Sequence, residues 1–277
     1  MPVRVVESKD NPRLKELRKA LAYSGRGARQ RVGIEGPHLL EEALRAGLHV
    51  ATAFVAQGAG SLLDALPLPP ETEILHLPRN LLESALATET PQPVAALIEP
   101  PNWSWENILR SGHQKPLILL FAGVQDPGNL GAILRSAEAF GATGAVSLPG
   151  TVSAWNPKAV RASAGSVFRL PVLAVNEQEC LEKLHGAGVT LYATTVNDAQ
   201  PAESVDMTAP VAFIIGNEGN GVAEELAARA DSRITIPCPG PVQSLNAAVA
   251  ASVLLYEAAR QRLSARIAPA ANRKARR

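Results

Sequence analysis

The fold is decided by the stretch Leu117-Ile-Leu-Leu-Phe-Ala-Gly-Val124, which is followed one residue later by Asp126-Pro-Gly-Asn-Leu-Gly-Ala-Ile-Leu-Arg-Ser-Ala-Glu-Ala-Phe-Gly141. The first part is a continuous apolar run, which is typical of a strand buried on both faces of a sheet. In the second part, apolar residues recur at helical spacing and form one stripe. A buried strand followed by an amphipathic helix predicts a unit of an α/β sheet.

The same alternation continues toward the end of the chain. Further apolar runs lie at 145–148, 170–175, 190–196, 211–215 and 234–237, separated by segments of helical length. This pattern predicts a parallel sheet covered by helices on both faces, so the expected class is α/β. Two more glycine-bearing segments follow such strands, Ile214-Ile-Gly-Asn-Glu-Gly-Asn-Gly221 and Ile236-Pro-Cys-Pro-Gly-Pro-Val-Gln-Ser-Leu-Asn246. Because ligands of open α/β sheets bind at the carboxyl ends of strands, we expect the site there.

The first hundred residues predict a separate, smaller α/β domain. Helical patterns cover 12–23 and 37–46, and strand patterns cover 32–35, 50–55, 74–77 and 94–98. A polar, proline-containing run with Trp103 and Trp105 follows and is interpreted as a linker. We therefore expect a domain at 1–100, a linker at 101–115, the larger domain at 116–265 and a basic, disordered tail at 266–277.

The charge of the chain is unevenly distributed. The net charge is only +1, but residues 1–35 hold 9 Lys/Arg against 4 Asp/Glu, and residues 258–277 hold 7 against none. The remaining residues hold 11 Lys/Arg against 22 Asp/Glu. Two basic ends on an acidic body favour contact with the phosphate backbone of a nucleic acid. For the last residues, a disordered tail that only aids solubility is the open alternative.

Composition also excludes several classes of protein. An apolar content of 46% is enough for sizeable cores, yet no apolar stretch reaches the roughly 18 to 20 residues of a membrane helix. The sequence begins without the long apolar core of a secretory signal, so we expect a cytoplasmic protein. The two cysteines, Cys180 and Cys238, have no spacing typical of disulfides or zinc sites, and we expect both to be reduced and no metal to be bound.

Three polar residues in the first two glycine-bearing segments are candidates for chemistry. Arg135 lies off the apolar stripe of its helix, near the positive end of the helix dipole, a position that favours a bound anion. An ion pair with Glu138 is the alternative for Arg135, and capping of the helix is the alternative for Asn129. Glu218 places a carboxylate in a glycine-rich turn after a strand, where an exposed, inactive glutamate is the alternative. The spacing of the glycines fits neither a dinucleotide-binding fold nor a phosphate loop.

The third segment predicts a stiff loop that leads into a long helix. Pro237, Pro239 and Pro241 restrict the backbone. Ser244 is expected to cap a helix that runs to about residue 264, with Leu245 and Asn246 in its first turn. Asparagine is a poor helix former, so Asn246 favours a functional role.

Taken together, these segments resemble the motifs of a known family. Asn129-Leu-Gly-Ala-Ile-Leu-Arg135, Gly216-Asn-Glu-Gly-Asn-Gly221 and Ser244-Leu-Asn246, with Lys158-Ala-Val-Arg-Ala-Ser-Ala-Gly165 between the first two, resemble the SpoU (TrmH-like) family of RNA 2′-O-ribose methyltransferases in the SPOUT superfamily. The resemblance covers roughly 117–262. The first hundred residues resemble the ribosomal-protein-like RNA-binding domain that often precedes it, through Ser8-Lys-Asp-Asn-Pro-Arg13 and Ile34-Glu-Gly36. Ala248 stands where the family often has serine.

The resemblance implies a parallel sheet whose C-terminal segment forms a deep trefoil knot, which a sequence pattern alone does not reveal. It implies an S-adenosyl-L-methionine site, a homodimer, and no metal. It also assigns site residues. The reaction centre would be lined by Asn129, Arg135, Glu218, Ser244 and Asn246, and the cofactor would be bound by Thr195, Gly216, Asn217, Ile236, Leu245 and Asn246.

The function implied is 2′-O-methylation of a ribose in RNA, with 23S ribosomal RNA as the expected substrate. Three alternatives stay open at this point: a tRNA ribose methyltransferase, a catalytically silent RNA-binding assembly factor, and a small-molecule enzyme with an adenine-containing cofactor. The presence of Asn129, Arg135, Glu218 and Asn246 argues against the silent factor, and the two basic ends argue against the small-molecule enzyme.

Overall fold

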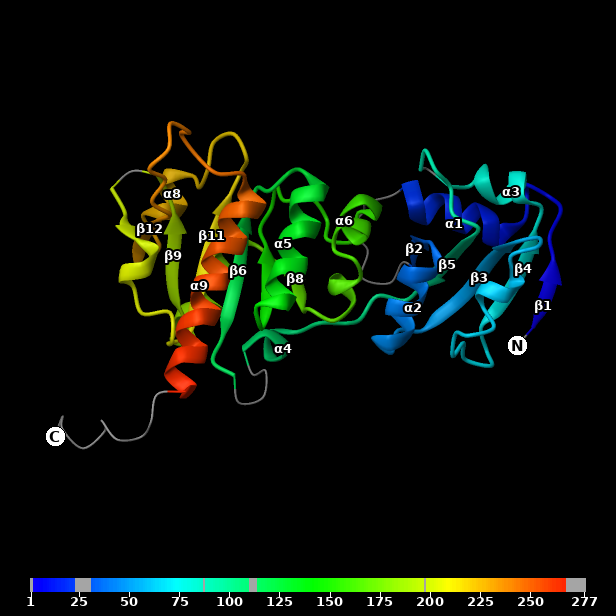
Figure 1. The fold of residues 1–277 in the computed structure, drawn as a ribbon, viewed down its shortest axis with the longest axis horizontal. Coiled ribbons are helices and arrows are strands. Elements are labelled where there is room, and N and C mark those ends of the chain that lie inside the picture. Colours follow the sequence, from blue (N-terminus) through cyan, green and yellow to red (C-terminus); the bar gives the residue numbers. More distant parts are fainter. Residues whose placement is uncertain (1, 23–30, 87, 110–113, 197, 268–277) are drawn as a thin grey trace. The chain divides into compact units, whose positions relative to one another are not determined.

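A computed structural model describes residues 2–22, 31–86, 88–109, 114–196 and 198–267. The chain divides into two compact units, and Figure 1 follows the elements of each. The first comprises Met1–Trp103, Asp126–Arg135 and Val152–Arg169; the second comprises Ser104–Gln125, Ser136–Thr151 and Leu170–Arg277. The expected disordered tail falls mostly on residues 268–277, outside the described residues. The domain boundaries from the sequence stay predictions.

The first unit contains a five-stranded mixed sheet with the strand order β1-β4-β3-β5-β2. Apolar side chains of α1 and α3 pack against β3, β4 and β5 to form its core. The two helices and four strands predicted here are confirmed, and β1, η1 and α3 are additional. The elements are β1 (Val3–Val5), α1 (Pro12–Ala22), β2 (Val32–Glu35), α2 (Pro37–Arg45), β3 (Val50–Ala56), η1 (Gly60–Leu62), β4 (Glu73–Leu77), α3 (Arg79–Glu83) and β5 (Val94–Ile98).

The second unit contains a seven-stranded sheet with the order β10-β12-β9-β11-β6-β7-β8, and all of its strand pairs are parallel. The six predicted strands are confirmed, and β10 is additional. The strands are β6 (Leu117–Ala122), β7 (Gly144–Ser147), β8 (Val172–Ala174), β9 (Thr190–Thr194), β10 (Gln200–Pro201), β11 (Val211–Gly216) and β12 (Ser232–Thr235).

The helices after the first hundred residues are α4 (Trp105–Leu109), α5 (Pro127–Ala139), α6 (Pro157–Ala162), η2 (Ser166–Phe168), α7 (Glu177–Gly186), η3 (Ala202–Ser204), α8 (Glu224–Ala227) and α9 (Ala247–Ile267). Helix α4 forms inside the segment that we interpreted as a linker, because Ile108 packs into the core of the second unit. The predicted stripe of α5 is buried at Leu130, Ile133, Leu134 and Ala137, whereas Phe140 is half-buried.

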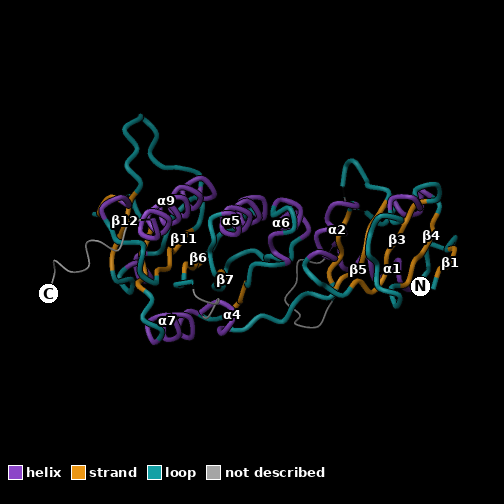
Figure 2. Tube along the Cα trace, turned by 60° about the horizontal axis from the view of Figure 1, so that its bottom comes forward, coloured by secondary structure: helices purple, strands orange, loops and turns teal. Residues whose placement is uncertain are grey.

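Helices lie on opposite sides of the seven-stranded sheet (Figure 2). Residues of α4, α7 and α8 pack with alternate residues of the strands in one core cluster. On the other side, Ser252 of α9 donates a hydrogen bond to Ser136 of α5, with 2.7 Å between the oxygens. Both faces are therefore covered, as expected for strands that are apolar throughout.

The end of α9 is attached to the amino ends of the central strands. The guanidinium of Arg262 donates to the carbonyl oxygens of Lys115 and Pro116, just before β6, at 2.8 Å each. It also donates to those of Met207 and Ala209, before β11, at 2.9 and 2.8 Å. One side chain thus joins the last helix to two neighbouring strands.

Candidate functional site

The predicted site residues of the second unit follow strands that all point the same way. Because β6, β9, β11 and β12 are parallel neighbours, the loops that follow them start from one edge of the sheet. These loops hold Glu218 and Asn217 after β11, Thr195 after β9, and Ile236, Ser244, Leu245 and Asn246 after β12. One edge of this sheet therefore carries the predicted site residues of the second unit.

The loop after β11 is closed on itself. Asn217 and Gly221 exchange both backbone hydrogen bonds, each 2.9 Å long. The side-chain oxygen of Asn217 accepts from the backbone N–H of Gly219 and Asn220, at 2.9 and 3.2 Å. A Cβ on Gly216 would lie 2.1 Å from the carbonyl carbon of Gly221 and 2.3 Å from the nitrogen of Val222. Glycine at position 216 is thus required by the closed loop.

Hydrogen bonds attach this loop to the loop after β6. The side-chain amide of Asn217 donates to the carbonyl oxygen of Gly123, at 3.0 Å, and the carboxylate of Glu218 accepts from the backbone N–H of Gln125, at 3.1 Å. Gly123 has φ +86°, and its N–H donates to the hydroxyl of Thr151 after β7, at 3.0 Å. The carboxylate of Glu218 is therefore held in one orientation at the sheet edge, although its side chain is exposed.

Two threonines, the last residue of β9 and the first residue after it, contact neighbouring strands. The hydroxyl of Thr194 donates to the carbonyl oxygen of Ile214 in β11, at 2.8 Å. The backbone N–H of Thr195 donates to the carbonyl oxygen of Ile234 in β12, at 3.0 Å. Thr195 thus lies at the sheet edge, and this position is compatible with its predicted role in cofactor binding.

The start of α9 differs from the prediction. The helix begins at Ala247, and its cap is Asn246, whose side-chain oxygen accepts from the N–H of Ala248 and Val249, at 2.8 and 3.3 Å. The expectation that Ser244 caps this helix is wrong, because Ser244 lies three residues before Ala247, in an exposed loop. Asn246 therefore has a structural role in addition to the predicted functional one.

The start of α5, in the first unit, also has a different cap. The helix begins at Pro127, and the carboxylate of Asp126 accepts from the N–H of Asn129, at 2.8 Å. The alternative that Asn129 caps the helix is therefore wrong, and Asn129 lies half-buried in the first turn. The hydrogen bond from Asn129, together with the ion pair to Lys158 at 3.1 Å, lowers the pKa of Asp126.

Helix α5 packs closely on α6 within the same unit. A Cβ on Gly131 would lie 2.4 Å from the carbonyl oxygen of Ala159 and 2.6 Å from the Cβ of Ala162. Arg135 follows one turn after Gly131 and is exposed. Its guanidinium makes no hydrogen bond or ion pair with any residue that the structure describes, so the alternative pair with Glu138 on the same helix does not form. Arg135 thus presents an unpaired positive charge to solvent.

The structure brings some predicted residues together and adds others. Within the second unit, Asn217 and Glu218 contact the loop after β6, Thr195 contacts β12, and Asn246 caps α9. Asn129 and Arg135 belong to the first unit, and their place in one site with these residues stays a prediction. The sequence interpretation missed Gly123, Gln125 and Thr151. Gly123 and Thr151 could have been found from their positions shortly after buried strands. No local sequence pattern distinguishes Gln125.

Neither a disulfide nor a metal site is found among the described residues. Both cysteines are free, and burial raises the pKa of Cys180 to about 12. The thiol of Cys238 is exposed and lies 3.4 Å from the carbonyl oxygen of Ile236. Among the described ranges, no group of three or more His, Cys, Asp or Glu side chains is placed to hold a metal ion. No helix in the described part of the chain has the length and apolar character needed to cross a membrane.

Comparison with known proteins identifies both parts of the chain. The profile of the SpoU rRNA Methylase family matches residues 116–256, and that of the MRM3-like substrate binding domain matches residues 11–96. The 23S rRNA (guanosine(2553)-2′-O)-methyltransferase RlmP of Bacillus subtilis is 34% identical over 253 residues, which cover 91% of this chain and 97% of RlmP. The 23S rRNA (uridine(2479)-2′-O)-methyltransferase of Streptomyces viridochromogenes is 35% identical over 202 residues, 71% of this chain and 70% of that protein.

Solved structures agree with the sequence relatives. The SpoU methyltransferase AviRb from Streptomyces viridochromogenes, in complex with AdoMet, has a TM-score of 0.79 and 30% identity, and the match covers 92% of this chain and 99% of AviRb. The predicted α/β class, the parallel sheet and the preceding substrate-binding domain are therefore confirmed. Because the profile spans about half of the chain and RlmP is matched over almost its whole length, the chain belongs to the SpoU rRNA Methylase family.

Proposed function

We propose that this protein transfers a methyl group from S-adenosyl-L-methionine to the 2′-hydroxyl of a ribose in 23S ribosomal RNA. The observation that carries the proposal is the closed, glycine-containing loop after β11, which fixes Glu218 at the sheet edge of a chain that matches RlmP almost completely. The two named relatives act on a guanosine and on a uridine. The base at the target position is therefore left open.

The residues at the sheet edge suit the cofactor in their chemistry. The loops at 195–199, 216–223 and 236–246 contain no Lys or Arg, and they contain Asp198 and Glu218, so a positively charged sulfonium meets no repulsion from them. Val196 and Val242 are 64% and 58% exposed and supply apolar surface for an adenine ring. Thr195, Gly216, Asn217, Ile236, Leu245 and Asn246 would hold the cofactor largely through their backbone. When bound, the cofactor supplies an electrophilic methyl group.

The residues of this chain would orient the ribose and deal with the proton of its hydroxyl. Methylation of the ribose hydroxyl would release its proton, which a base supplied by this chain would have to accept. Arginine stays protonated in proteins, so we assign the unpaired guanidinium of Arg135 to a neighbouring phosphate or to the developing charge on the oxygen. Glu218, directly or through water, would accept the proton. Asn129, Ser244 and Asn246 would complete the reaction centre by orienting the two reactants.

We also propose a homodimer, for which α9 supplies the supporting observation. Val249, Val253, Tyr256, Leu263 and Ile267 are between 39% and 80% exposed and recur at intervals of three, four or seven residues. This spacing forms one apolar stripe along the helix, and such stripes are usually covered by a partner. The trefoil knot stays a prediction from the resemblance, and the rRNA substrate favours the cytoplasm as the place of the reaction.

The test is methyl transfer from radiolabelled cofactor to size-separated total RNA from a host lacking this gene. We expect label in the large-subunit rRNA, and we expect Arg135→Ala to lower kcat/KM by about 100-fold or more. Retained activity in Arg135→Lys would support binding of charge, and full activity in Arg135→Ala would refute either role for Arg135.

Asn246 needs a control that separates its two roles. Asn246→Ser retains a helix cap and removes the amide, whereas Asn246→Ala removes both. Loss of activity in both variants, with unfolding unchanged in Asn246→Ser, would support a place in the reaction centre. Label in tRNA would replace rRNA as the substrate, and cofactor binding without label in any RNA would indicate a catalytically silent assembly factor.

A further inference from the structure

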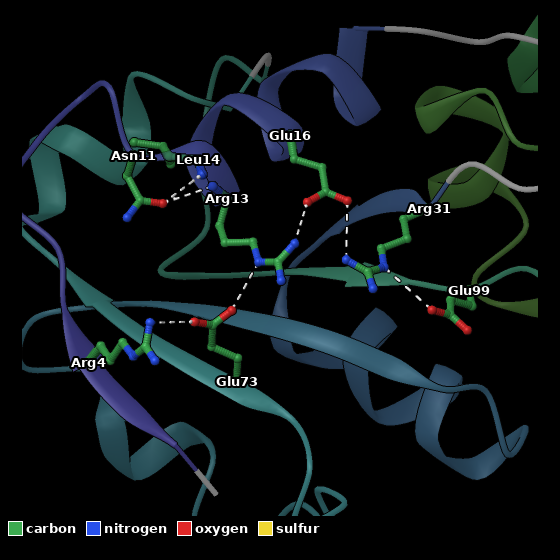
Figure 3. Close-up of polar contacts among 8 residues, drawn as sticks. All are labelled: Arg4, Asn11, Arg13, Leu14, Glu16, Arg31, Glu73 and Glu99. Carbon is green, nitrogen blue, oxygen red and sulfur yellow. Dashed lines mark hydrogen bonds and ion pairs between the residues drawn. The ribbon is translucent and has the colours of Figure 1, made fainter.

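Helix α1 separates the cations of the N-terminal domain into two groups. On one flank, Arg13 donates to Glu16 and Glu73, at 3.0 Å each (Figure 3). Arg31 extends this network to Glu16 and Glu99, at 3.3 and 3.5 Å. Arg4 lies 3.6 Å from Glu73. The positive charges on this flank are therefore balanced within the domain.

The other flank carries Lys9, Arg18 and Lys19, which we call the α1 basic patch. The guanidinium of Arg18 donates to the carbonyl oxygen of Lys9, at 3.2 Å, and to the hydroxyl of Ser84, at 3.3 Å, and neither acceptor is charged. Lys9 and Lys19 are exposed. No carboxylate in the described part of the chain lies within ion-pair distance of these three side chains.

Asp10, which interacts electrostatically with Arg18, is already paired. Asp10 lies 2.8 Å from Lys15, and its pKa is lowered mainly by the hydrogen bond from Lys15, with Arg18 as the smallest contribution. Every other Lys or Arg that the structure describes up to residue 103 has a carboxylate partner; these are Arg4, Arg13, Lys15, Arg31, Arg45 and Arg79.

Helix geometry gathers the patch on one surface. At about 100° per residue, positions 15, 18 and 19 share one side of α1, while Leu14, Leu17 and Leu21 face the core. Positions 13 and 16 point to the flank of the ion-pair network. Lys9 precedes the helix and is joined to Arg18 by the hydrogen bond above. Arg18 and Lys19 thus share a side of α1 with the Lys15–Asp10 pair, away from the ion-pair network of Arg13.

We infer that the α1 basic patch binds the phosphate backbone of the RNA substrate, and that the paired arginines of the same domain do not. Cations without an internal partner keep their full charge for phosphate and release counterions when they bind it. The hydroxyl of Ser84 donates to the carbonyl oxygen of Leu81, at 2.7 Å, and accepts from Arg18, so it orients the guanidinium without neutralising its charge. The inference rests on the proposed function, since the domain belongs to an enzyme family that acts on rRNA.

The experiment compares two triple variants of the full chain that lose the same charge. Lys9→Gln/Arg18→Gln/Lys19→Gln removes the patch, and Arg4→Gln/Arg45→Gln/Arg79→Gln removes three exposed, paired arginines. Binding to purified 23S rRNA from a host lacking the gene is measured over a range of salt concentrations, and cofactor affinity is measured in parallel. Each phosphate contact contributes about 0.7 to 0.9 to the slope of log K against log salt.

We expect the patch variant to lower that slope by about 2 and to weaken RNA binding about tenfold or more at low salt, with cofactor affinity unchanged. The control variant should change the slope by less than about 0.5. Equal slopes in the two variants would overturn the inference while leaving methyl transfer by the wild type intact, and would favour an acidic protein as the partner of the patch. Failure of the wild type to bind and methylate any RNA would instead refute the proposed function.

Discussion

The loops after β11 and β12 start from the same sheet edge but are shaped in different ways. The loop Asn217–Gly221 is closed by two backbone hydrogen bonds, and Asn217 attaches it to Gly123. In the loop after β12, every residue from Pro237 to Ser244 is exposed, and three prolines restrict it. The first loop is held by its own backbone hydrogen bonds, whereas prolines restrict the backbone of the second.

This difference indicates that the two loops have different roles in binding. A loop held by internal hydrogen bonds has the same shape with and without a ligand, so it can orient a carboxylate such as Glu218 in advance. An exposed loop has surface left to bury, and it can gain contacts from a cofactor or from a second subunit.

The largest effect is expected where the closed loop excludes a side chain. In Gly216→Ala, the new Cβ would overlap the backbone of Gly221 and Val222, so the loop must open. We expect a loss of unfolding free energy of about 3 kcal/mol and at least about 100-fold weaker cofactor binding. Urea unfolding and calorimetric titration measure the two quantities. Gly219→Ala is the control, because its Cβ would lie at an ordinary 3.5 Å from Asn217, and an equal loss there would refute the argument.

Cofactor binding should order the two loops unequally. We expect S-adenosyl-L-methionine to slow amide hydrogen exchange about tenfold in residues 238–246 and to change it much less in residues 217–221, which are hydrogen-bonded already. Hydrogen exchange followed by mass spectrometry, with and without cofactor, gives the comparison. Greater slowing in the β11 loop than in the β12 loop would contradict the proposed difference.

Removal of one hydrogen bond should weaken the closed loop without opening it. Asn217→Asp keeps the acceptor for Gly219 and Asn220 but places a carboxylate against the carbonyl oxygen of Gly123. We expect a loss of about 1 to 2 kcal/mol in unfolding free energy. Asn220→Asp adds the same charge at an exposed neighbour, and it should cost less than about 0.5 kcal/mol. Similar losses in both variants would mean that charge, rather than the bond to Gly123, is responsible.

The smallest effect is expected at the start of α5, which follows the β6 loop. The pKa of Asp126 is lowered in the folded protein, so its contribution to stability is present above the unfolded value of about 4 and is lost as pH falls through the lower folded value. Asp126→Asn keeps a cap and removes the charge. We expect a loss below about 1 kcal/mol at pH 7 and a flatter decline in acid. A steeper decline, measured by thermal unfolding between pH 2 and 7, would contradict this sign.

Strand and helix positions were predictable because they depend on local periodicity. The elements that were missed are short or polar: β1 exposes Val3 and Val5, and α4 is recognisable only through Ile108, which is buried by distant residues. The strand order, and any knot built on it, depends on contacts between residues far apart in the chain, which periodicity does not contain.

The site was predictable in its motifs and less so in its geometry. Two long helices carry predicted site residues, and each has two candidate caps within three positions, Asp126 or Asn129 for α5 and Ser244 or Asn246 for α9. The path of the preceding loop decides between them. The contact of Glu218 with Gln125 joins residues that are 93 positions apart. The motif identified the carboxylate but could not identify the backbone group that orients it.

Helix α9 is fixed at both of its ends, by Asn246 at the start and by Arg262 near the end. Since Arg262 is bonded to the segments that precede β6 and β11, the helix cannot slide along its axis unless those bonds break. Any adjustment of the β12 loop during a catalytic cycle must then come from rotations of its own backbone, and its prolines leave few of these. Product release from such a site would be limited by a few backbone torsions in residues 237–245, so proline-to-alanine changes there would alter turnover more than they alter folding.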